Sequence, residues 1–90
     1  MNSARRLQIK NIMSKLNDIK SQLDALKEAV TDIQAEEEEY RDNMPENLQE
    51  SDRYCKADEA CDKIEDANNN FDNIDEEIEA ALDSLEEAMA

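Results

Sequence analysis

The apolar residues in the first half of the chain recur at alternating spacings of three and four. This spacing is typical of a coiled coil, whose positions are labelled a to g and whose a and d residues face a partner helix. With Ile9 at position a, the a and d positions through residue 33 are all aliphatic: Ile9, Ile12, Leu16, Ile19, Leu23, Leu26, Val30 and Ile33. The pattern predicts a helix over about residues 4–42 with these residues as its pairing seam.

A second helical pattern covers the last part of the chain, where large and small apolar residues alternate. With Ile64 at position a, the a residues are large and the d residues are mostly alanine, Ile74 being the exception. Cys61, Leu82 and Met89 widen the apolar face at neighbouring e positions. The spacing predicts a second helix over about residues 52–88, with a pairing seam of Ile64, Phe71, Ile74, Ile78 and Leu85.

The segment 43–51 separates the two patterns and holds the only proline of a chain without glycine. Pro45 fits the first turn of a helix, and Ser51 is a typical N-cap residue. We favour a separate turn over about residues 43–51, and the alternative is one helix that starts at Pro45. Either way, residues 1–90 form a single all-α domain, in which two long helices make an antiparallel coiled-coil hairpin.

The composition of the chain indicates that such a hairpin does not exist as a monomer. The 90 residues include one Phe, two Tyr and no Trp, so the apolar packing relies on aliphatic side chains. A two-helix hairpin buries one stripe per helix, and so small a core is marginal without further coverage. We therefore predict that two copies form a homodimeric four-helix bundle.

Charge is distributed unevenly along the chain, whose net charge is −15. Residues 1–34 carry six Lys and Arg against four Asp and Glu, whereas residues 35–90 carry four against twenty-one. A reversal at the turn pairs residues whose numbers add to roughly 92 to 96. We therefore expect acids between Asp72 and Glu87 to face five basic residues of the first helix: Arg5, Arg6, Lys10, Lys15 and Lys20.

The sequence shows no signature of a catalytic or metal-binding site, because its many carboxylates lie on solvated helices without the burial that separates an acid from a base. There is no His and no Gly-rich phosphate loop, and Cys55 and Cys61 lie six apart, which on a helix excludes a local disulfide. Oxygen-bearing residues over 66–77 match part of a calcium loop, but Phe71 occupies the position that needs glycine for a sharp turn. We predict no enzymatic activity, no cofactor and no metal.

The acidic surface suggests a binding role. Duplex DNA carries roughly one charge per 1.7 Å of its axis, and a dimer of this chain offers roughly one per 2 Å. We therefore expect acids of the second helix to mimic a phosphate backbone and to bind the basic groove of a nucleic-acid-binding protein. These acids are Asp62, Glu65, Asp66, Asp72, Glu76, Glu79 and Asp83. In the alternative, charge provides only solubility and register, and the chain is a homo-oligomeric structural or assembly protein.

Charge and hydropathy also bear on partners and location. A chain at −15 repels nucleic acid and anionic membranes, so we expect a basic protein as partner and neither of these. No apolar run approaches the roughly 18 residues of a membrane span, and the N-terminal residues do not read as a signal peptide. We expect the protein in the cytoplasm.

Residues 43–49, Asn-Met-Pro-Glu-Asn-Leu-Gln, are followed by Ser51, Arg53, Tyr54 and an acidic helix. This segment resembles a group of uncharacterised small proteins from phages and mobile elements of Gram-positive gut bacteria, over roughly residues 36–88. In that group a glycine often stands where this chain has Glu50. The resemblance implies a bacterial host cell, and small acidic phage accessory proteins frequently inhibit host defence enzymes, some as DNA mimics. The expected function is such an inhibitor.

Overall fold

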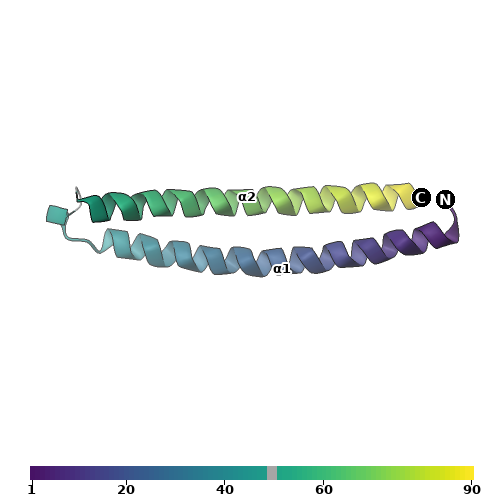
Figure 1. The fold of residues 1–90 in the computed structure, drawn as a ribbon, viewed down its shortest axis with the longest axis horizontal. Helices are drawn as coiled ribbons and strands as arrows, with labels where there is room; N and C mark the ends of the chain where they lie inside the picture. The colour runs from purple at the N-terminus through teal and green to yellow at the C-terminus, as the bar shows by residue number, and fades with distance from the viewer. Residues whose placement is uncertain (49–50) are drawn as a thin grey trace.

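The computed structural model describes residues 1–48 and 51–90 and shows an elongated helical hairpin (Figure 1). Helix α1 covers Ser3–Asp42, the short 3-10 helix η1 covers Glu46–Leu48, and helix α2 covers Asp52–Met89. The two long helices lie antiparallel, with both chain ends at the same end of a body measuring 70 × 16 × 13 Å. The prediction of an all-α hairpin is confirmed, and no strand occurs within the described ranges.

Polar side chains cap the N-terminal ends of both long helices. The side chain of Asn2 accepts a hydrogen bond from the Arg5 amide at 2.8 Å, and Ser51 does the same for Tyr54 at 3.4 Å. Each interaction satisfies one of the amides that a helix start leaves without an intrahelical partner. Ser51 is therefore the N-cap of α2.

The connection between the helices contains the 3-10 turn that follows Pro45. The Leu48 amide donates to the Pro45 carbonyl at 2.9 Å, and α1 stops before Met44, the residue whose helical conformation Pro45 disfavours. No described residue has a positive φ, so this part of the reversal needs no glycine. Residues 49 and 50 of the predicted turn lie outside the described residues.

The register between the helices is shifted from the predicted one. Lys20 pairs with Glu79 and Lys27 pairs with Asp72, so the numbers in each pair add to 99 instead of 92 to 96. The start of α2 extends beyond the end of α1, and the start of α1 extends beyond the end of α2 (Figure 1). Arg5 and Arg6 consequently lie past Met89, and neither belongs to an ion pair within the described ranges.

The contact between the helices uses a and e positions. In α1 the a residue Leu23 is buried, while Ile9, Leu16 and Val30 are half-buried. The e positions of this helix are half-buried as well: Met13, Lys20, Lys27, Gln34 and Arg41. In α2 the a and e positions from Cys61 onward are buried or half-buried: Cys61, Ile64, Asn68, Phe71, Asp75, Ile78, Leu82, Leu85 and Met89.

The d positions of the predicted seam lie outside this contact. The four from α1 and the one from α2 are 45 to 58% exposed: Ile12, Ile19, Leu26, Ile33 and Ile74. Alanine at most d positions of α2 offers little surface to pack against, whereas Cys61, Leu82 and Met89 offer more at e. The two helices are therefore rotated so that e replaces d in the interface.

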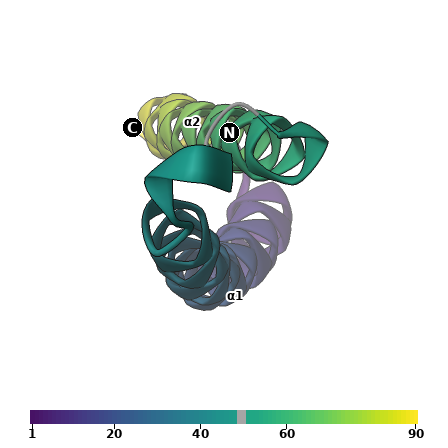
Figure 2. The same cartoon turned by 90° about the vertical axis from the view of Figure 1, so that its left-hand side faces the viewer.

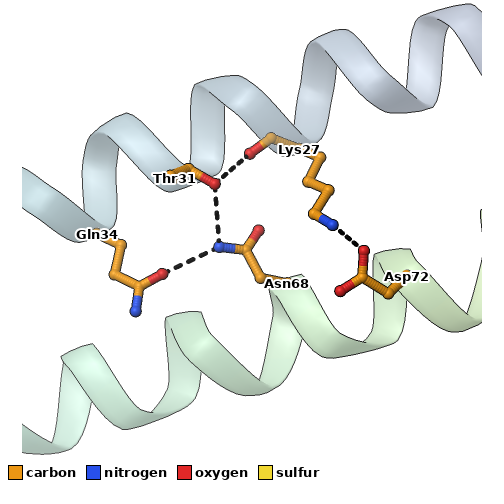
Figure 3. A network of polar contacts seen from close by, with 5 residues as sticks. All are labelled: Lys27, Thr31, Gln34, Asn68 and Asp72. Atoms are coloured by element: carbon orange, nitrogen blue, oxygen red, sulfur yellow. Dashed lines mark hydrogen bonds and ion pairs between the residues drawn. The ribbon is translucent and has the colours of Figure 1, made fainter.

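A polar layer interrupts the apolar contact near its middle (Figure 3). The Asn68 side-chain amide donates to Gln34 Oε1 at 3.0 Å and to Thr31 Oγ1 at 3.4 Å, and Thr31 donates to the Lys27 carbonyl. The remaining Asn68 oxygen is buried and has no hydrogen-bond partner. Such a layer favours one register of the two helices and lowers their stability.

Replacing Asn68 with Leu is expected to stabilise the hairpin. The substitution removes the unpaired oxygen and continues the apolar e positions, a gain of about 1 kcal/mol, or roughly 4 °C or more in melting temperature. Asn69→Leu, at the neighbouring exposed position, controls for helix propensity. Melting followed by circular dichroism should rank Asn68→Leu above Asn69→Leu, and the reverse order would mean that the polar layer stabilises the fold.

Candidate protein-binding surfaces

The rotation of the helices gives the hairpin two different flanks. In an antiparallel pair that uses a and e in both helices, the d positions of both lie on one side, and the b and e positions lie on the other. Contacts across the pair agree with this geometry. Arg53 and Tyr40, both at d, share a hydrogen bond of 3.0 Å, and Arg41 at e reaches Asp58 at b over 2.9 Å.

The b and e positions form a polar flank. Three ion pairs cross it, Lys20 with Glu79, Lys27 with Asp72 and Arg41 with Asp58, together with the amide layer of Asn68. The hydrogen bond to Glu79 raises the pKa of Lys20, and the pairing of Arg41 with Asp42 and Asp58 raises its pKa. These charges are largely matched within the hairpin itself.

From Ile12 to Tyr40 in α1 and from Ala60 to Ala88 in α2, the d positions form an apolar flank along the opposite side. Its large members from α1 are 44 to 58% exposed, although each would be buried in a conventional coiled coil. Alanines and one isoleucine of α2 continue the same flank. We define the apolar flank as Ile12, Ile19, Leu26, Ile33, Tyr40, Ala60, Ala67, Ile74, Ala81 and Ala88.

The seven acids predicted to bind a partner are all exposed. Two of them, Asp72 and Glu79, hold Lys27 and Lys20 across the polar flank. The other five do not take part in the ion pairs formed within the described ranges, and they occupy b, c and f positions away from the apolar flank. We call them the outer acidic face: Asp62, Glu65, Asp66, Glu76 and Asp83.

Sequence reasoning expected Lys20 to face acids that include Glu79, but it did not identify Lys27, Arg41 and Asp58 as members of ion pairs, although a signal for them was present. Lys20, Lys27 and Arg41 are separated from one another by multiples of seven residues, and so are their partners Asp58, Asp72 and Glu79. Oppositely charged residues that share the coiled-coil repeat mark positions at the edge of a helix interface. Searching for this spacing would have identified both sets.

The two cysteines have different surroundings and are both free. Cys61 is 3% exposed at an e position, and burial raises the pKa of its thiol. Cys55 is exposed on the first turn of α2. A raised pKa keeps the Cys61 thiol protonated at neutral pH, which makes it a packing residue. Residues 1–48 and 51–90 contain no group of three or more His, Cys, Asp or Glu placed to hold a metal ion.

A shallow pocket of about 310 Å³ lies at the closed end of the hairpin, where α1, the turn and α2 meet. Figure 2 views the molecule from this end and shows η1 between the ends of the two helices. Tyr40 and Arg53 place the pocket next to the apolar flank. Its lining residues are Tyr40, Asn43, Met44, Pro45, Leu48, Ser51 and Arg53.

No protein-family model, curated protein or solved structure matches this chain. Within the described ranges, neither long helix is apolar enough over a sufficient length to cross a membrane.

Proposed function

We propose that this protein is an assembly module that binds helical partners through its apolar flank. The observation that carries the proposal is the exposure of five large apolar side chains of α1 on one side of a 70 Å rod. Apolar patches of this extent mark interaction sites in soluble proteins. A flat stripe at coiled-coil spacing fits the apolar face of another helix.

The two flanks differ in how much they gain from a partner. The polar flank already carries ion pairs and amide hydrogen bonds inside the hairpin, so covering it would require their desolvation. Covering the apolar flank removes hydrocarbon from water. Burial of the exposed half of five such side chains contributes on the order of 5 kcal/mol per copy. This difference selects the apolar flank as the docking side.

A second candidate function rests on the outer acidic face. Its five carboxylates are exposed and take no part in the ion pairs between described residues, so they are available to a basic partner. In the phage setting that the turn segment suggests, the partner is a host nuclease or DNA-binding protein in the bacterial cytoplasm, and the protein inhibits it by mimicking nucleic-acid charge. The outer acidic face and the apolar flank occupy different sides, so one hairpin can use both.

One pair of variants separates the two candidates. Leu26→Asp places a charge on the apolar flank, and the combined changes D62N, E65Q, D66N, E76Q and D83N neutralise the outer acidic face. Each tagged protein is used to retain partners from an extract of the cells that produce it. Competition with duplex DNA for the retained proteins is measured at low salt.

For an assembly module, Leu26→Asp should lose at least about 90% of the retained partners, including added untagged copies of the chain, and the neutralised variant should keep them. Retention unaffected by Leu26→Asp would overturn the assembly role. Loss of both retention and DNA competition in the neutralised variant alone would establish the charge mimic instead.

A further inference from the structure

We propose that a second copy of this chain covers the apolar flank, in a bundle whose two turns lie at the same end, so that α1 of each copy faces α2 of the other. This inference rests on the assembly role proposed above and specifies its partner and geometry. Three features of the hairpin support it: the sizes of the flank residues, the charge of the two helices and the area of the flank.

Four of the five large residues of α1 match an alanine of α2 in height along the flank, and the fifth matches Ile74. The structure aligns residues whose numbers add to about 99. A two-fold axis parallel to the long axis leaves every residue of the second copy at its original height. Each large d residue of α1 then faces a d residue of α2 whose number completes a sum of 100. The pairs are Ile12 with Ala88, Ile19 with Ala81, Leu26 with Ile74, Ile33 with Ala67 and Tyr40 with Ala60.

The opposite arrangement, with the turns at opposite ends, packs these residues poorly. It places α1 against α1 and α2 against α2. Large side chains such as Ile19 and Ile33 then meet each other in one contact, and Ala67 and Ala81 meet in the other. Because side-chain size sets helix spacings between about 8 and 10 Å, one contact is held wide while the other needs to be narrow. Large residues against alanine give equal spacings in both contacts.

The charges of the two helices also favour the arrangement with both turns at the same end. Residues 1–34 carry a net +2 and residues 35–90 carry −17, so α2 against α2 brings together the two most acidic surfaces. Glu36 and Lys63 occupy g positions beside the apolar flank, and their numbers also add to 99. Neither belongs to an ion pair within the described ranges of the hairpin. With the turns at the same end, Glu36 of each copy lies opposite Lys63 of the other.

The flank is also large enough for a stable dimer. A contact about 10 Å wide, one helix diameter, along a body 70 Å long covers roughly 700 Å² per copy. The total of roughly 1,400 Å² lies within the range of about 1,200 to 2,000 Å² that stable interfaces bury. A second hairpin presents the same flank in return, so that one two-fold contact covers the apolar flanks of both copies.

Spin labels at two sites test the arrangement. Cys55, exposed near the turn, is labelled in a Cys61→Ala background, and pulsed electron resonance measures the distance between labels in different copies. With the turns at the same end, we expect a distance of about 30 Å, and with the turns at opposite ends about 55 Å. Ser21→Cys, near the middle of the rod and exposed, provides the control in a background without either native cysteine. Its distance stays near 30 Å in both arrangements.

A short distance at both sites supports the proposal. A short distance at residue 21 with about 55 Å at Cys55 would retain the second copy but overturn the same-end arrangement. The absence of any distance between copies at residue 21, in samples that circular dichroism shows to be helical, would overturn the second copy itself. In that last case the assembly role survives only if Leu26→Asp still abolishes retention of a different protein, so the two failures are distinguishable.

Discussion

Leu23→Asp is expected to abolish the cooperative thermal transition of the hairpin. Leu23 is the most deeply buried large side chain among the described residues, with 9% of its surface exposed. Truncation of such a leucine costs about 2–5 kcal/mol, and an aspartate adds the penalty of a carboxylate without a partner. In the observed register the new charge lies near the height of Asp75, which has a buried oxygen without a partner. Circular dichroism against temperature measures the loss.

Ser21→Asp is the matched control for this experiment, because it adds the same charge at an exposed position of the same helix. Its melting temperature should stay within a few degrees of that of the unaltered chain, since exposed substitutions rarely exceed about 0.5 kcal/mol. If Leu23→Asp melted cooperatively at the temperature of this control, residue 23 would not lie in the helix contact.

Leu26→Asp should have a different effect, although it lies only three residues away. Leu26 is 58% exposed, so the contact between α1 and α2 does not depend on it. In the dimer that we propose, however, it faces Ile74 of the other copy, and two-fold symmetry introduces the carboxylate twice. We expect the dissociation constant of the dimer to increase at least about 100-fold, equivalent to about 2.7 kcal/mol. The melting temperature of the unaltered chain should depend on protein concentration, and that of Leu26→Asp should not.

Ala25→Asp provides the comparison for Leu26→Asp, because residue 25 is exposed and points away from the helix contact and from both flanks. Its melting temperature should still rise with protein concentration, as we expect for the unaltered chain. Equal behaviour of the two variants would show that residue 26 contributes nothing beyond its charge, and the apolar flank would lose its assigned role.

The existence of the two helices could be predicted from the sequence because the apolar spacing, the single proline and the N-cap at Ser51 all agree. The side of each helix that faces the other helix could not be predicted from the sequence. An apolar repeat of three and four places a residues at the centre of a contact, and the contact can extend toward d or toward e. In this chain Leu82 and Met89 at e outweigh the alanines at d, and residues such as Leu26 are left exposed.

The exposure of the seven candidate acids could be predicted from the sequence, but which of them form ion pairs with α1 could not. All seven acids chosen from the second helix are exposed, yet Asp72 and Glu79 neutralise lysines of α1. That pairing depends on the register, which the connection between the helices determines. A midpoint estimated from the turn segment misplaced the register by a few residues, enough to assign Arg5 and Arg6 to partners that they do not meet.

Sedimentation equilibrium of the unaltered chain beside Leu26→Asp tests the central claim, that the apolar flank binds a second copy. The chain has a mass of 10.3 kDa. At micromolar concentration the unaltered chain should sediment with twice that mass, and Leu26→Asp with the mass of one chain while remaining helical. A single-chain mass for the unaltered protein up to about 100 μM, or a dimer that Leu26→Asp leaves intact, would contradict the account.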